Sequence, residues 1–173
     1  AYATGGLRIG FAVTKAGRRR KPLVSITRLH NLGEGGIRFT LHIGAWSRRL
    51  TVPALGEHNA HNCAAAAAIA HAMGIGAEEV AAGLCQYRPM DKRMAAKDLP
   101  GGVKLVNDAY NANPASMAAG LRTLAALATA GKGKRKSMAV LGDMLELGAA
   151  SPAQHQGIGN AEGRERLQCL PLR

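Results

Sequence analysis

The chain has 173 residues, of which 47% are hydrophobic, 3% aromatic and 20% charged. This composition excludes a chain that is disordered throughout, and it predicts a core of alanine and aliphatic side chains rather than aromatic rings. No run approaches the roughly 20 apolar residues of a membrane-spanning helix, and the opening AYATGGLRIG lacks the basic and apolar regions of a signal peptide. The chain also starts without a methionine, which suggests part of something longer.

The net charge of +12 is concentrated at one end of the chain. Residues 1–50 hold ten Lys and Arg with one acid, Glu34, whereas the remainder is nearly balanced. The run Arg18–Lys21 is interpreted as a solvated hairpin tip, because no aromatic residues alternate with the charges as base stacking would need. Nucleic acid is therefore disfavoured as a partner. Cys63, Cys85 and Cys169 are odd in number and far apart, which favours free thiols in a reducing cytoplasm.

Residues 7–54 are predicted to form a small antiparallel β region. Apolar and polar residues alternate in LRIGFAV, LVSITRL, IRFTLHI and RRLTVPA, and turn-forming segments separate these four strands. The pattern then changes to helix in GEHNAHNCAAAAAIAHAMG, where Asn59 is expected as the N-cap and Gly74 as the left-handed C-cap residue. AEEVAAGLCQ predicts a second, shorter helix with acids in its first turn.

The next segment, RMAAKDLPGGVKLVND, predicts a hairpin that turns at Pro100-Gly101-Gly102. Its second strand is expected to be buried, and it leads into NDAYNANP, which places Asn107, Asp108, Asn111 and Asn113 before a proline. Asn113 is expected to cap a helix that begins at Pro114. That helix should bury one apolar face, formed by Met117, Leu121, Leu124 and Ala128.

AGKGKRK, residues 130–136, is interpreted as a linker. A phosphate-binding loop would need glycine where Ala128 stands, as well as a strand before it and a helix after it. The remainder predicts a buried strand in SMAVLG, a helix from Ser151-Pro152 and a strand in RLQCL, which is the first unit of a parallel α/β domain. The chain is therefore expected to be α/β, with one domain part in 1–129 and a second in 137–173.

Two sets of polar side chains are candidates for a binding site. Asn59 and Asn62 lie three apart at a helix start, where free amides can bind a nucleobase edge or a phosphate, although Asn59 taken alone is better explained as only a cap. Asp108 follows a strand, where open α/β sheets place ligand groups; it could hold two ribose hydroxyls or simply form a turn. His58 and His61 have a spacing compatible with a metal, but no further ligand pattern completes a site.

Taken together, these pieces resemble the Mur ligases. The resemblance rests on G-E-H-N-x-x-N with its alanine-rich helix, on Arg93, on N-D-A-Y-N-A-N-P at 107–114 and on V-L-G-D-M-L-E-L-G at 140–148. It runs from about Ser25 to His155. H-N-x-x-N alone would also fit folylpolyglutamate synthases, and another Mur ligase or a basic nucleic-acid-binding module are the alternatives.

The resemblance implies a cytoplasmic, monomeric ATP- and Mg²⁺-dependent amide ligase that adds D-alanyl-D-alanine to UDP-N-acetylmuramoyl-tripeptide. This chain would hold the later part of its central ATPase domain and the start of a Rossmann-like C-terminal domain. The resemblance further implies that Asn59 and Asn62 lie at the nucleotide, that Arg93 reaches the phosphates and that Asp108 holds the ribose, with His58, Tyr110 and Asn111 beside them. The phosphate loop and the metal ligands are expected upstream, so the chain alone should not turn over.

Overall fold

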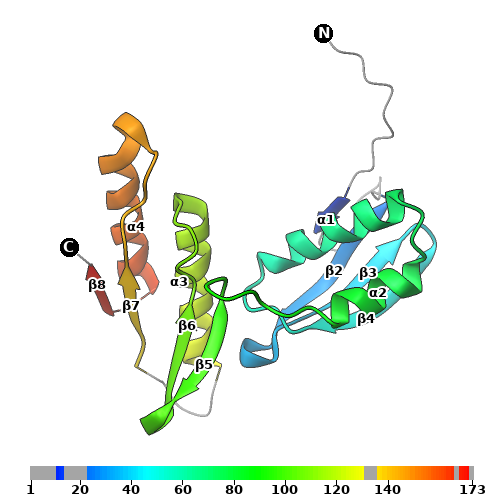
Figure 1. Cartoon of the computed structure of the whole chain (residues 1–173), viewed down its shortest axis with the longest axis horizontal. Coiled ribbons are helices and arrows are strands. Elements are labelled where there is room, and N and C mark those ends of the chain that lie inside the picture. Colours follow the sequence, from blue (N-terminus) through cyan, green and yellow to red (C-terminus); the bar gives the residue numbers. More distant parts are fainter. Residues whose placement is uncertain (1–10, 14–22, 131–135, 166–167, 172–173) are drawn as a thin grey trace. The chain divides into compact units, whose positions relative to one another are not determined.

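The structure, a computed structural model, describes residues 11–13, 23–130, 136–165 and 168–171. The expected basic loop at Arg18–Lys21, most of the linker and the Cys169 side chain lie outside the described residues. The chain divides into two compact units, Ala1–Arg88 and Pro89–Arg173 (Figure 1). Among the described residues no helix is both long enough and apolar enough to cross a bilayer.

The first unit is built on a four-stranded sheet in the order β1-β2-β3-β4. Its strands are β1 (Phe11–Val13), β2 (Val24–Asn31), β3 (Ile37–Ile43) and β4 (Trp46–Val52), with a short 3-10 turn at Gly33–Gly35. The antiparallel pairing of β2, β3 and β4 confirms the prediction. The prediction is wrong for β1, which runs parallel to β2 with Phe11 opposite Val24. Parallel neighbours are not the two arms of a hairpin, so the antiparallel prediction fails for this pair of strands.

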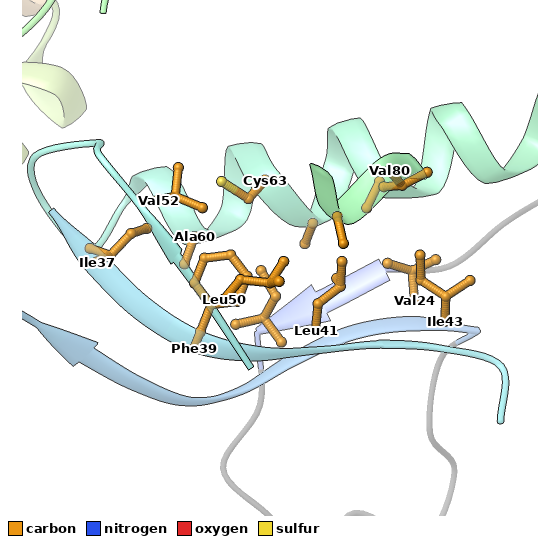
Figure 2. Close-up of a cluster of buried hydrophobic side chains, with 14 of the residues drawn as sticks. Val24, Ile37, Phe39, Leu41, Ile43, Leu50, Val52, Ala60, Cys63 and Val80 are labelled. Atoms are coloured by element: carbon orange, nitrogen blue, oxygen red, sulfur yellow. The ribbon is translucent and has the colours of Figure 1, made fainter. Parts of the chain in front are cut away.

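Two helices, α1 (Asn59–Ala72) and α2 (Ala77–Cys85), pack on one face of this sheet. Alternation along β3 points Ile37, Phe39, Leu41 and Ile43 toward the helices, and all four are buried. The facing side of α1 repeats every three or four residues and consists of small side chains: Ala60, Cys63, Ala64, Ala67 and Ala68. Figure 2 shows these aliphatic side chains meeting between sheet and helices. The described core of this unit is thus mostly aliphatic, with Phe39 inside it and Trp46 packed at its edge, as the low aromatic content predicts.

The ends of α1 differ in how well the sequence predicted them. Gly74 has φ +85 and follows the last turn, which confirms the left-handed C-terminal glycine. Asn59 is not the N-cap: that position is His58, whose side chain makes no capping bond. A cap is unnecessary there, because the first N–H groups of the helix donate to the carbonyls of Gly56, Glu57 and His58 in a preceding tight turn.

Glu78, in the first turn of α2, ties that helix to β4. Its carboxylate accepts one bond from Trp46 Nε1 at 3.0 Å and another from Arg48 Nη1 at 2.6 Å. These two bonds, with that from Trp46 the larger cause, lower the pKa of Glu78. The contact is exposed to solvent, so it fixes the position of α2 more than it stabilises the fold.

The second unit contains a hairpin, two helices and a parallel strand pair. The elements are β5 (Ala95–Leu99), β6 (Val103–Asn107), α3 (Pro114–Thr129), β7 (Met138–Leu141), α4 (Ser151–Glu165) and β8 (Gln168–Pro171), with short 3-10 turns at Pro100–Gly102 and Gly148–Ala150. The antiparallel β5–β6 pair confirms the predicted hairpin. The parallel β7–β8 pair, separated along the chain by α4, confirms the predicted strand–helix–strand unit.

The prediction that β6 and β7 are buried strands is wrong. Val103 and Leu105 are 56% and 47% exposed, and Met138 and Val140 are 56% and 55% exposed. Each strand belongs to a sheet of only two strands among the described residues, so one face of each has little to pack against. The sequence signals β-forming residues here, but burial depends on neighbours that lie elsewhere in a fold.

The expected boundary at 130–136 differs from the division into compact units, which falls after Arg88. The reason lies in the packing of α3. Leu121 on α3 shares one small hydrophobic cluster with Ala139 of β7, Met144 and Ile158 of α4. The segment between α3 and β7 therefore connects elements of one compact unit.

Candidate functional site

Asn59 and Asn62 lie together at the start of α1 in the first unit; we call them the amide pair. The Nδ2 of Asn62 donates to Oδ1 of Asn59 at 2.9 Å, as their three-residue spacing on a helix predicts. The Nδ2 of Asn59 donates in turn to the Leu55 carbonyl at 2.8 Å and lies 3.3 Å from His58 Nε2. Asn59 is half-buried and Asn62 is exposed. The inner asparagine thus orients the outer one.

The two amides have different roles: Asn59 is bonded within the protein, whereas Asn62 faces solvent. A carboxamide offers two N–H donors and an oxygen with two lone pairs. Asn62 commits one N–H to Asn59, which leaves its oxygen and its second N–H to meet a ligand at the surface. The His58 ring contacts the Asn59 amide, so this side chain lies next to the amide pair.

In the second unit, the loop before β5 and the loop after β6 are bonded to each other. Asp108 Oδ1 accepts the Met94 backbone N–H at 3.0 Å. The Tyr110 backbone N–H donates to the Lys92 carbonyl, also at 3.0 Å. Between these two bonds, the Arg93 guanidinium lies over the Tyr110 ring with Cζ 3.9 Å from the ring centroid. We call Arg93, Asp108 and Tyr110 the arginine cluster.

The arginine cluster is exposed, and its chemistry suits an anion. Tyr110 is 61% exposed, and Arg93 and Asp108 also face solvent. Stacking uses the face of the guanidinium and leaves its N–H groups, which lie in the guanidinium plane, for hydrogen bonds. Arg93 therefore presents donors to a phosphate or a carboxylate, and Asp108 retains Oδ2 as an acceptor for hydroxyl groups.

The asparagines around Asp108 serve the backbone. Oδ1 of Asn107 accepts the Ala109 N–H at 3.2 Å, and Oδ1 of Asn111 accepts the Ala112 N–H at 2.8 Å. Asn113 caps α3: its Oδ1 accepts the Ser116 N–H at 2.9 Å, and Ser116 Oγ accepts the Asn113 N–H at 3.1 Å. This reciprocal pair confirms the predicted cap at Asn113 and the start of α3 at Pro114. All three asparagine oxygens of residues 107–114 therefore shape the loop that holds Asp108.

His155 and the backbone of Lys92 and Met94 carry structural roles that were not predicted. His155 Nδ1 donates to the Ser151 carbonyl at 2.8 Å, and its Nε2 accepts the Met144 N–H at 3.1 Å. It thereby ties the loop 142–148 to α4, and its position four residues after Ser151 is the only sequence signal. The contacts of Lys92 and Met94 could have been predicted from the hairpin register. Ala95 pairs with Asn107, so continuing the antiparallel pairing past the strand ends places 94 opposite 108 and 92 opposite 110.

No group of three or more His, Cys, Asp or Glu side chains suited to a metal occurs in the described part of the chain. The amide pair and the arginine cluster belong to different compact units. The expectation that Asn59, Asn62 and Asp108 line one concave surface therefore stays a prediction.

Residues 92–166 match the family described as Mur ligase, glutamate ligase domain. Over 123 residues the chain is 42% identical to the UDP-N-acetylmuramoyl-tripeptide–D-alanyl-D-alanine ligase of Mycobacterium tuberculosis, a match that covers 70% of this chain and 24% of that protein. The chain thus spans about a quarter of the length of this curated relative.

Solved structures show the same similarity. A crystal structure of MurF from Acinetobacter baumannii superposes with a TM-score of 0.75 at 27% identity, covering 95% of this chain and 39% of that one. MurF from Thermotoga maritima, solved in complex with ADP, shares the fold at 19% identity with a TM-score of 0.67, covering 83% of this chain and 32% of that one.

Proposed function

We propose that this chain, a member of the Mur ligase family, is part of an ATP-dependent ligase that joins D-alanyl-D-alanine to UDP-N-acetylmuramoyl-tripeptide in the synthesis of peptidoglycan precursors. The single observation that carries the proposal is the 42% identity to a ligase of that name over 123 residues. We propose further that the unit 89–173 begins the C-terminal domain, which is supported by the family match at 92–166, and that the preceding unit is the later part of the central domain.

In this proposal, both sets of polar residues contact ATP. Arg93 binds the phosphates through its in-plane N–H groups, and Asp108 accepts from the ribose hydroxyls through Oδ2. Asn62, oriented by Asn59, meets the nucleotide with its amide, while His58, Tyr110 and Asn111 stand beside these contacts. Support comes from the paired geometry within each set and from the ADP that accompanies the Thermotoga maritima relative.

The proposed reaction has two steps. The tripeptide carboxylate attacks the γ-phosphorus of ATP, so that an acyl phosphate forms and ADP leaves. The amine of D-alanyl-D-alanine then attacks the acyl carbon, an amide forms, phosphate leaves and the amine gives up a proton. Negative charge on the transferred phosphoryl group is what a guanidinium such as Arg93 offsets. Magnesium, which family membership implies, finds no cluster of suitable ligands among the described residues, so no step is assigned to it.

The ligase is further proposed to act as a monomer in the cytoplasm. Cys63 and Cys85 are free thiols, which suits a reducing compartment. Another Mur ligase remains the competing activity, because the amide pair belongs to the wider family resemblance. The N-D-A-Y-N-A-N-P and L-G-D-M-L-E-L-G strings and the name of the relative favour the activity proposed here.

The test uses the full-length ligase that contains this sequence. Asp108→Ala should raise the KM for ATP more than it lowers kcat, because ribose contacts are made equally in the ground and transition states. Phosphate release at varied ATP measures both constants. Asp98→Ala is the matched control, since Asp98 is a carboxylate of the same unit that pairs with Lys104 and takes no part in the proposed site. Unchanged ATP kinetics in Asp108→Ala would contradict the nucleotide role, and a large kcat loss at constant KM would assign Asp108 to catalysis instead.

A further inference from the structure

Arg93 is held from both sides by the loop that follows β6. The residue before it, Lys92, accepts the Tyr110 N–H, and the residue after it, Met94, donates to Asp108 Oδ1, each at 3.0 Å. The side chain between them lies over the Tyr110 ring at 3.9 Å. Three independent contacts thus converge on one exposed arginine.

The backbone of this segment is in a conformation that needs such support. Lys92 and Met94 have φ values of +59 and +51, in the left-handed region that side chains other than glycine rarely occupy. Such residues persist only where the surrounding structure determines them. Met94 is 8% exposed and anchors the segment, while Asp108 and Tyr110 bond its two strained residues. Two local bonds also hold the segment, from the Lys92 N–H to Asp91 Oδ1 at 2.9 Å and from the Arg93 N–H to the Met90 carbonyl at 3.1 Å, but only the bonds of Asp108 and Tyr110 tie it to the loop after β6.

We infer that Asp108 and Tyr110 are positioning residues that fix Arg93 for an anionic group of the substrate complex, a role that rests on the proposed function. The two oxygens of Asp108 then have separate tasks. Oδ1 holds Met94, and Oδ2 lies on the side of α3, 3.7 Å from where a Cβ on Gly120 would stand. Tyr110 acts through its ring, which orients the guanidinium while leaving the donors in the guanidinium plane free.

The first experiment measures positioning on the chain itself. Ring current from Tyr110 should shift the Arg93 side-chain protons upfield in NMR spectra. Tyr110→Phe should keep that shift and Tyr110→Leu should abolish it. Asp108→Asn retains an oxygen to accept the Met94 N–H and should keep the shift, whereas Asp108→Ala should reduce it. Unshifted Arg93 protons in the unmodified chain, or an unchanged shift in Tyr110→Leu, would overturn the inference.

The second experiment measures the consequence in the full-length ligase. Tyr110→Leu should raise the KM for ATP about two- to fivefold, the equivalent of an exposed cation–π contact, and Tyr110→Phe should restore it. In an Arg93→Met background Tyr110→Leu should have no further effect, because Tyr110 acts only through Arg93. Additive effects of the two substitutions would refute the positioning role. A third outcome would separate the two proposals. If the unmodified chain shows shifted Arg93 protons but the Arg93→Met ligase has normal ATP kinetics, the contacts that position Arg93 are upheld and the proposed nucleotide site is refuted.

Discussion

Cys63 makes the stability of the first unit depend on pH in a defined window. The thiol lies in the core at 7% exposure, and burial, with a smaller contribution from the nearby Cys85, raises its pKa from 9.0 to about 11. Burial disfavours the thiolate, so below pH 9 the thiol is protonated whether the chain is folded or not. Above pH 9 the unfolded chain loses this proton first, and the folded state loses stability until the pH passes the folded pKa.

The size of the effect follows from the shift. Two pKa units correspond to about 2.7 kcal/mol, of which about 2 kcal/mol should be lost between pH 8 and pH 10.5. Trp46 is the chain's single tryptophan and lies in β4, so its fluorescence during urea unfolding reports the first unit alone. The matched control is Cys63→Ala, which removes the titrating group.

The comparison uses the change with pH in each chain, because Cys63→Ala also leaves a small cavity that lowers stability at every pH. Tyrosine and lysine titrate in the same range, but they do so equally in both chains. The unmodified chain should therefore lose about 2 kcal/mol more than Cys63→Ala over this window. Parallel curves would refute the reasoning, since the thiol would then titrate alike in the folded and unfolded states.

Three further predictions concern local structure. Asn113→Ala should cost α3 about 1 kcal/mol and speed hydrogen exchange in its first turn, whereas Asn113→Asp should keep protection; equal exchange in both would contradict the cap. Gly36 has φ +84, and a Cβ added there would lie 2.2 Å from the Val52 backbone oxygen. Because the left-handed φ and the backbone clash act together, Gly36→Ala should destabilise the first unit by more than about 3 kcal/mol, measured by Trp46 fluorescence during urea unfolding. Gly35→Ala, which would meet only the Leu32 side chain, is its control, and similar losses in both would count against the clash. NMR titration should give Glu78 a pKa below its ordinary value of 4.5, and this pKa should rise more in Trp46→Phe than in Arg48→Gln. Any stability that the Glu78 carboxylate contributes is present above pH 4.5 and is lost as the pH falls through the lowered pKa. A measured pKa of 4.5 in the unmodified chain would show that neither bond lowers it.

Local patterns predicted local structure well. Strict alternation placed a strand over 37–43, and β3 has those bounds. The Asn113-Pro114 pair predicted a capped helix start because both residues act on the adjacent backbone. The parallel pairing of β1 was missed, since strand direction depends on chain path rather than on residue type. Exposure of β6 and β7 was missed for a related reason, because apolar β residues do not specify what covers them.

In the candidate site, too, contacts between residues near in sequence were easier to predict than contacts across the hairpin. Asn59 and Asn62 meet because helical spacing alone brings them to one face, and the sequence predicted that both lie at the helix start but not the bond between them. Arg93 meets Tyr110 across a hairpin, and only the register fixed by the turn at 100–102 sets that contact. Family resemblance grouped Arg93, Asp108 and Tyr110 without giving the reason. The physical reason is that the ladder of β5 and β6 continues past its ends, so that 92–94 face 108–110.

The last prediction concerns the chain on its own, which should bind ATP at millimolar dissociation constants or more weakly. Its sequence contains no G-x-x-x-x-G-K-[ST] loop, whose backbone N–H groups and lysine supply most of the phosphate affinity in enzymes that have one. In the proposed site, Asn62, Arg93 and Asp108 would offer ATP a few hydrogen bonds, each worth about 0.5–1.5 kcal/mol net. Against them stands the lost translational and rotational freedom, at least about 4 kcal/mol. Calorimetric titration with ATP, with Asp108→Ala as the control chain, measures the sum. A micromolar dissociation constant that the substitution abolishes would contradict this accounting, because it would require these residues to supply affinity that such contacts do not reach.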